Sequence, residues 1–279
     1  MARGISLHIG LNAVDPLQYQ GWSGELNACE ADARDMSAIA SAAGFSTHLL
    51  LTAEATAEAV LEALGGAATD LVAGDTFLLT YSGHGGQIPD TGGDEEDGQD
   101  ETWVLHDRQV LDDELRGAYC AFAEGVRVAV FSDSCHSGTV TRMGPPLAAG
   151  ATPSGAQLQA PAALGARSKA MPAAVSQRDF LRRSDTYNAL RQRESGDTEP
   201  RACVALISGC QDNQLSLDGT FNGLFTATLL TVWNGGQFRG GYRRLRNRIA
   251  ARMPETQTPR FGHIGPNDRG FLAGQPFTP

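Results

Sequence analysis

The sequence is poor in lysine, in long apolar runs and in cysteines that could pair. Lys169 is the lone lysine among 22 basic residues, and the others are arginines. No apolar run approaches the ~20 residues of a membrane helix, so no membrane span is predicted. Five cysteines, an odd number without close spacing, argue against a disulfide framework and favour a reducing, cytoplasmic compartment. The N-terminal residues show no cleavable leader pattern and are predicted to form a first strand.

Charge is unevenly distributed along the chain. The net charge is −10, and six acids fall within residues 94–101, which leaves −4 for the remainder. Arginines cluster in residues 239–252, where an amphipathic helix with a solvated basic face is favoured over a nucleic-acid site. The scarcity of lysine beside abundant Ala, Gly and Arg suggests a GC-rich bacterial genome.

Strand and helix patterns alternate, which predicts an α/β fold with helices on both faces of a sheet. Strands are expected at 5–11, 45–51, 75–81, 126–132 and 202–207, and helices at 25–43, 52–72, 112–122, 221–233 and 242–252. Residues 140–200 are rich in Ala, Pro, Gly, Ser and Arg, and we expect a flexible linker there. We predict one domain over 1–279, in which this linker separates a larger part (1–139) from a smaller one (201–279).

Two short motifs carry the chemistry. Residues 81–86 read YSGHGG and residues 133–138 read DSCHSG, and each directly follows a predicted buried strand. If the two strands are parallel neighbours, Cys135 and His84 meet at one edge of the sheet. A thiol with a nearby imidazole is a nucleophile with its proton acceptor. The N–H groups of Gly85 and Cys135 are the candidate oxyanion donors, and His136 is assigned a structural role.

Most lone cysteines are buried, inert side chains, and we prefer this interpretation for Cys29, Cys120 and Cys203. Cys135 differs because it lies in a polar loop of small residues that has no packing use for a thiol. Asp133, two residues before it at a strand end, is also a candidate site residue. The sequence therefore favours a cysteine peptidase.

The chain resembles the caspase-like cysteine peptidases of clan CD, in particular the metacaspase and orthocaspase branch of peptidase family C14. The matching segments are 26–33 (LNACEADA), 81–85 (YSGHG), 93–101 (GDEEDGQDE), 133–138 (DSCHSG) and 207–214 (ISGCQDNQ). The resemblance implies a caspase-like α/β/α sandwich with a mostly parallel central sheet. It also implies endopeptidase cleavage after Arg or Lys, with Asp32, Asp133 and Ser82 lining the pocket for the basic side chain.

The resemblance raises the question of calcium. Many metacaspases bind an activating calcium through aspartates that correspond here to Asp100, Asp112 and Asp113. A further aspartate commonly follows seven residues after the nucleophile, and Arg142 occupies that position in this sequence. The acids of 94–101 are otherwise a solvated acidic loop. No cofactor is expected for the chemistry itself, and calcium dependence stays open at this point.

The linker offers sites for self-cleavage by an enzyme that cuts after basic residues. The candidates are Arg142, Arg167, Lys169, Arg182 and Arg183. Two alternatives remain beside an active peptidase: a silent caspase-like scaffold, and a zymogen whose site is occupied by the linker or by residues 12–22. The expected partners are protein or peptide substrates with Arg or Lys at the cleaved position. We expect no membrane or nucleic-acid partner, and a monomer or weak dimer.

Overall fold

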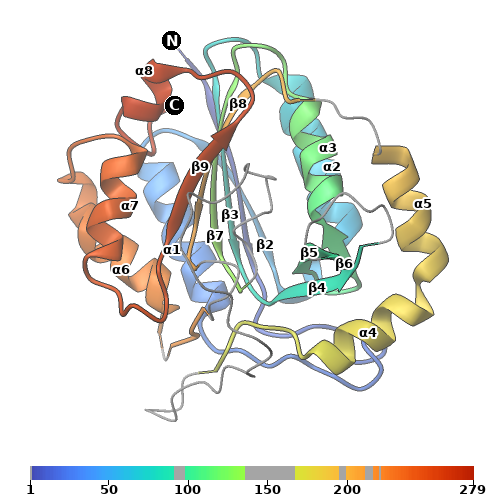
Figure 1. Ribbon diagram of the computed structural model, residues 1–279. Helices are drawn as coiled ribbons and strands as arrows, with labels where there is room; N and C mark the ends of the chain where they lie inside the picture. Colours follow the sequence, from blue (N-terminus) through green and yellow to red (C-terminus); the bar gives the residue numbers. More distant parts are fainter. Residues whose placement is uncertain (1, 91–97, 136–166, 195–198, 211–215, 220) are drawn as a thin grey trace.

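A six-stranded sheet forms the centre of the molecule (Figure 1). The computed structural model describes residues 2–90, 98–135, 167–194, 199–210, 216–219 and 221–279. The strand order is β2-β1-β3-β7-β8-β9, and only β9 runs antiparallel to its neighbour. The strands are β1 (Gly4–Gly10), β2 (Ser46–Leu51), β3 (Thr76–Ser82), β7 (Arg127–Asp133), β8 (Cys203–Ser208) and β9 (Arg260–Ile264).

Helices cover both faces of this sheet (Figure 1). One apolar layer joins it to α2 (Ala57–Asp70) and α3 (Asp112–Cys120). The other joins it to α1 (Cys29–Ala42), α6 (Leu224–Trp233), α7 (Tyr242–Ala250) and α8 (Arg269–Ala273). The α/β/α sandwich with a mostly parallel sheet is therefore confirmed.

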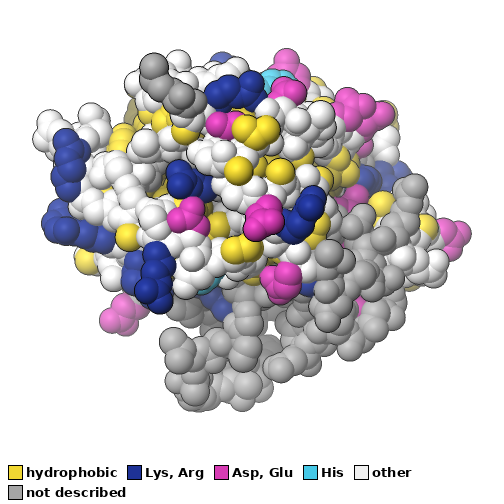
Figure 2. Space-filling view, turned by 90° about the horizontal axis from the view of Figure 1, so that it is seen from above, with side chains coloured by type: hydrophobic (Ala, Val, Ile, Leu, Met, Phe, Trp, Pro, Cys, Tyr) yellow, Lys and Arg dark blue, Asp and Glu magenta, His cyan; other side chains and the backbone are white. Residues whose placement is uncertain are grey.

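Burial explains the sequence patterns of these elements. β3 lies between two strands and under helices, and all seven of its residues are buried, as its near-continuous apolar run requires. In α7, Tyr242, Leu245 and Ile249 are buried while Arg243 and Arg244 are exposed. Seen from above, arginine or lysine side chains lie along the edge of the molecule on the α6–α8 side (Figure 2). The arginine-rich segment thus forms the amphipathic helix that was expected.

A small antiparallel sheet lies beside the main one and contacts a helix of the segment expected to be a linker. It consists of β4 (Gly85–Pro89), β5 (Gln99–Val104) and β6 (Gln109–Leu111). Two helices that the sequence did not predict, α4 (Ala173–Arg182) and α5 (Ser184–Glu194), follow along it and along α3 (Figure 1).

Two expectations about local structure are corrected. The flexible linker expected over 140–200 is wrong for 173–194, which is helical, and most of its first half lies outside the described residues. The helix expected from Thr52 begins instead at Ala57, because the side chain of Thr56 caps it, and Thr52–Glu54 forms a separate 3-10 turn. Within the described part of the chain, no helix is long and apolar enough to cross a membrane.

Candidate active site

The two sequence motifs meet at the carboxyl ends of neighbouring strands. β3 and β7 pair in parallel, and Ser82 lies opposite Asp133. His84 follows β3 by two residues and Cys135 follows β7 by two residues. Both side chains are buried, with exposures of 6% and 0%. The strand adjacency that the sequence argument required is therefore present in the fold.

A backbone carbonyl and an indole ring hold the imidazole of His84. Its Nε2 lies 3.0 Å from the carbonyl oxygen of Gly24, and its ring centre lies 4.9 Å from that of Trp22. Burial lowers the pKa of His84 to about 4, although the Gly24 carbonyl and the backbone of Lys169 and Ala170 favour the charged ring. Nδ1 is buried and has no hydrogen-bond partner among the described residues. The neutral ring thus keeps one nitrogen available for a substrate proton.

The thiol of Cys135 lies in surroundings that favour its ionised form. Its Sγ accepts a hydrogen bond from the Ser216 N–H at 2.9 Å. Burial disfavours the thiolate, but hydrogen bonds from Cys210 and Ser216 and the charge of Lys169 outweigh it and lower the pKa of Cys135. The sulfur is therefore suited to act as a nucleophile.

A lysine of the same chain lies among the three residues expected to bind a basic side chain. Lys169 Nζ is 3.2 Å from Asp32 Oδ2 and 3.1 Å from Asp133 Oδ2, and it donates to Ser82 Oγ at 2.9 Å. The lysine and both carboxylates are at most 2% exposed. Burial opposes the ammonium charge, but the acidic neighbours, Asp133 foremost, raise the pKa of Lys169 well above its usual range. The group recognises a cation by paired carboxylates out of water.

Donors at the start of α6 hold the two carboxylates in place. Asp32 Oδ1 accepts hydrogen bonds from the Gly223 N–H and from Asn222 Nδ2, both at 3.0 Å. Asp133 Oδ2 accepts one from Thr226 Oγ1 at 2.9 Å and one from the Thr226 N–H at 3.3 Å. The N-terminus of a helix favours negative charge, so these donors stabilise carboxylates at this position.

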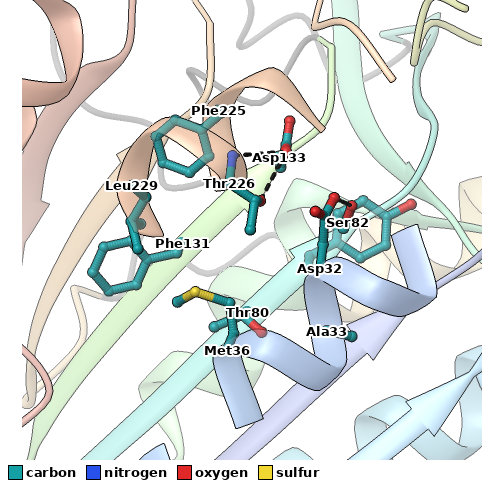
Figure 3. A pocket seen from close by; sticks show the side chains of 11 residues that line it. Asp32, Ala33, Met36, Thr80, Ser82, Phe131, Asp133, Phe225, Thr226 and Leu229 are labelled. Atoms are coloured by element: carbon teal, nitrogen blue, oxygen red, sulfur yellow. Dashed lines mark hydrogen bonds between the residues drawn. The ribbon is translucent and has the colours of Figure 1, made fainter. Parts of the chain in front are cut away.

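Next to the carboxylates the pocket is apolar (Figure 3). Figure 3 shows Asp32 bonded to Ser82 and Asp133 bonded to Thr226, with hydrophobic side chains on the far side. The apolar lining comes from Ala33 and Met36 of α1, Phe131 of β7, and Phe225 and Leu229 of α6. Low-polarity walls strengthen the attraction between the carboxylates and a cation.

The backbone around Lys169 is extended and pairs on both sides with the candidate site. The Lys169 N–H donates to the Ser216 carbonyl at 2.9 Å, and the Asp218 N–H donates to the Arg167 carbonyl at 2.8 Å. The Gly85 N–H donates to the carbonyl oxygen of Lys169 at 2.9 Å. Lys169 therefore fills the acidic pocket with its side chain, while its carbonyl oxygen accepts the N–H of Gly85, the glycine named above as an oxyanion donor.

The other basic residues considered for self-cleavage lie elsewhere. Arg167 is exposed and donates to the Glu25 carbonyl at 2.7 Å. Arg182 and Arg183, at the end of α4, both donate to Gln18 Oε1, at 2.9 and 2.7 Å. Arg142 lies outside the described residues. Of the candidates that the structure describes, Lys169 is the one bound to the acidic pair.

Of the aspartates considered for calcium, Asp100 is paired with a cation of the same chain. Asp100 is 1% exposed, and Arg191 of α5 donates to its Oδ2 through Nε at 2.6 Å. Asp112 and Asp113 begin α3, where Asp112 Oδ1 accepts the Asp113 N–H at 3.0 Å. Among residues whose placement is described, no acidic, His or Cys side chains gather into a metal-binding group. Arg191 already supplies a positive charge to Oδ2 of Asp100, and calcium binding through these aspartates stays a prediction.

Three residues of the site were assigned no role from the sequence. Ser216, Cys210 and Trp22 reach Cys135 or His84 only through tertiary contacts between distant segments. The position of Lys169 had one signal, since it is the lone lysine in a chain that otherwise uses arginine.

The fold and this site together define a caspase-like domain. A family model for the caspase domain of Peptidase C14 matches residues 4–264, and the chain belongs to this family. Metacaspase-1A of Aspergillus fumigatus is 30% identical over 250 residues, which are 80% of this chain and 58% of that protein. Metacaspase-1 of Coccidioides immitis is 29% identical over 80% of this chain and 52% of its own length. The chain thus spans a little over half the length of these curated relatives.

Two solved structures share the fold of this chain. Protein GSU0716 from Geobacter sulfurreducens is 49% identical, with a TM-score of 0.84 over 99% of this chain and 98% of that one. Caspase-1 from Spodoptera frugiperda is 14% identical, with a TM-score of 0.54 over 94% of this chain and 86% of its own, and shares the fold. The expected membership in the caspase-like peptidases is confirmed.

Proposed function

We propose that this protein is a cysteine endopeptidase that cleaves after Lys or Arg and that its first substrate is its own Lys169–Ala170 bond. One observation carries the proposal: the Lys169 ammonium lies between Asp32 and Asp133 while its carbonyl accepts the Gly85 N–H. These are the two contacts that a substrate residue makes before its bond is cut. Asp32, Asp133 and Ser82 are thus the specificity group, and Cys135 and His84 the catalytic pair.

The first half of the reaction acylates the enzyme. His84 takes the thiol proton of Cys135, and the sulfur forms a bond to the carbonyl carbon of Lys169. The Gly85 N–H, which already binds this oxygen, stabilises the negative charge that develops on it, and the Cys135 N–H is the second proposed donor. The C–N bond then breaks, and the amine of Ala170 leaves with the proton held by His84. The product is a thioester of Lys169 and a new N-terminus.

The second half releases the acyl group. His84 accepts a proton from water while the water oxygen attacks the thioester carbon. The C–S bond breaks, and Cys135 regains a proton as the thiol. His84 must therefore be neutral before each half-reaction, which agrees with the direction in which burial moves its pKa.

The same geometry supports the zymogen alternative over the scaffold alternative. While the chain is intact, residues 167–171 occupy the positions that an external substrate would need. Cutting the Lys169–Ala170 bond allows these residues to leave the site, so activity toward other substrates should follow self-cleavage. A protein that served only as a scaffold would not require a cysteine with a lowered pKa beside a bound lysine.

The test combines intact-mass analysis with peptide hydrolysis. Wild-type protein should yield two fragments that separate after Lys169, and Cys135→Ala should remain whole. A His84→Ala variant should be slower by about 10²–10⁴-fold. Lys169→Arg should still be cut, and Lys169→Gln should not.

Fluorogenic peptides ending in Arg, Lys or Asp then report on specificity after self-cleavage. Hydrolysis after Arg and Lys, absent in Cys135→Ala, is the expected result. Preference for Asp would contradict the role of the acidic pocket. An intact chain that hydrolyses none of the peptides would favour the scaffold.

A further inference from the structure

Two residues beyond Lys169, the side chain of Met171 fills an apolar space of its own. Met171 is 6% exposed and packs in a cluster with Val14, Tyr19, Trp22, Val104 and Val175 of α4, which we call the Met171 cluster. A Cβ on Gly86 would lie 3.4 Å from the Met171 sulfur, so the backbone of β4 closes another side. The cluster therefore accepts a long apolar side chain.

The backbone fixes which residue enters the Met171 cluster. Gly85 donates to the Lys169 carbonyl and accepts from the Met171 N–H at 2.8 Å, so residues 169–171 run parallel to the start of β4. Side chains of an extended segment alternate in direction, and Ala170 is only partly buried between its two buried neighbours. Any substrate that pairs with Gly85 in the same way presents its second residue after the cut bond to this cluster.

Four members of the cluster belong to the body of the enzyme. Val14, Tyr19 and Trp22 lie in the loop after β1, and Val104 lies at the end of β5. Tyr19 is anchored by a hydrogen bond from its hydroxyl to the Leu105 carbonyl at 2.7 Å. The Trp22 ring also contacts His84, so the cluster adjoins the proposed catalytic pair. Among the described residues of the cluster, no side chain carries a charge.

We infer that the Met171 cluster is a substrate-binding subsite, selective for an unbranched or γ-branched apolar residue at the second position after the cleaved bond. The inference rests on the proposed function and extends it, because the acidic pocket reads only the residue before that bond. The preferred protein substrates then have Lys or Arg, a small residue, and Met or Leu in sequence. A charged residue at the last position would lose its hydration without a partner.

Internally quenched peptides test the subsite in trans. Self-cleaved wild-type enzyme receives peptides with the sequence Ala-Gln-Ser-Lys-Ala-X-Pro-Ala, which hold one basic residue and in which X is Met, Leu, Gly or Asp. The expected kcat/KM for Met and Leu exceeds that for Gly and Asp by about 10–100-fold. Equal rates, or a preference for Asp, would overturn the inference.

A fluorogenic peptide that ends at Lys and has no residue after the bond separates the two hypotheses. If it is hydrolysed while X makes no difference, the subsite fails and the proposed function stands. If neither kind of peptide is hydrolysed, the proposed function fails and the subsite fails with it.

Self-cleavage in cis gives an independent measurement. Met171→Leu should be cut at the wild-type rate, and Met171→Asp should be cut about 10–100-fold more slowly. Ala174→Asp is the matched control, because it adds the same charge at an exposed position of α4. Equal slowing by both Asp variants would assign the effect to the charge of the segment and would contradict the subsite.

Discussion

At the scale of single residues, the proposed recognition of a basic side chain requires a glycine at position 223, where a side chain would clash with the acidic pocket. A Cβ at Gly223 would lie 2.4 Å from Asp133 Oδ2 and 2.5 Å from Lys169 Nζ. We therefore expect Gly223→Ala to move a carboxylate or the bound cation and to lower kcat/KM for Arg and Lys peptides by about 100-fold. Steady-state hydrolysis of the fluorogenic peptides measures the loss.

Gly66→Ala is the control for this substitution. Gly66 lies in α2 and is exposed, and nothing lies within 4 Å of the Cβ that would be added. This change should leave hydrolysis unaltered and add about 0.5–1 kcal/mol to the free energy of unfolding. Full activity in Gly223→Ala would show that the acidic pocket does not bind the substrate cation as proposed.

His8 gives a second prediction at this scale, on stability rather than activity. Its two ring nitrogens lie 2.8 Å from Thr80 Oγ1 and 2.9 Å from Ser6 Oγ, and burial lowers its pKa to about 3. The unfolded chain therefore binds the proton first as the pH falls below about 6.5, and stability decreases from there down to the folded pKa. At pH 5 the cost is about 2 kcal/mol relative to neutral pH.

Urea unfolding at pH 7.5 and pH 5 measures this effect. His8→Asn should lose less free energy on acidification than the wild type, by about 2 kcal/mol. His48→Asn, at an exposed position of β2, should behave as the wild type. Parallel losses in the wild type and His8→Asn would exclude His8 as a source of acid sensitivity.

At the scale of elements, the ion pair between Arg191 and Asp100 attaches helix α5 to β5. The side chains are 8% and 1% exposed, so the pair is buried. Removing one partner leaves an uncompensated charge, and we expect Arg191→Gln to lower the free energy of unfolding by about 3–5 kcal/mol. The double variant Arg191→Gln with Asp100→Asn should recover part of this loss, while Arg178→Gln, on the exposed face of α4, should cost little.

The same pair predicts the response to calcium. Because Arg191 already neutralises Asp100, peptide hydrolysis by the wild type should be equal in calcium and in chelator. A strong activation by calcium would show that the ion displaces Arg191 or binds through other residues. Isothermal titration with calcium, on wild type and Arg191→Gln, distinguishes these two outcomes.

The sequence correctly predicted the elements that depend on local hydrophobic pattern. Apolar runs located β3 and β7, and the polar loops after them located His84 and Cys135. Helices α4 and α5 were missed because their apolar faces are short and follow a long segment without periodicity. They are also stabilised by contacts to β4, α3 and Asp100, which the sequence pattern does not show. The placement of Lys169 between two aspartates depends on three segments far apart in sequence. Local sequence patterns do not predict such a tertiary contact.

At the scale of the whole molecule, the proposed cut does not divide the fold into separable parts. Strand β7 precedes Lys169 and β8 follows it, yet the two strands pair over six residues in the middle of one sheet. The second apolar layer likewise combines Phe131 with Phe225 and Leu229. Each fragment alone would expose this core to water.

We therefore expect the two fragments to remain one particle after self-cleavage. Native size-exclusion chromatography should give a single peak at the position of uncut Cys135→Ala protein, and intact mass should show both fragments in it. Denaturant should then separate them. Fragments that elute apart without denaturant would mean that residues 167–171 hold the halves together, and the site would lose its pocket on cleavage. Because Asp32 and Asp133 come from the first fragment and Gly223 and Thr226 from the second, activity itself requires that the halves stay paired.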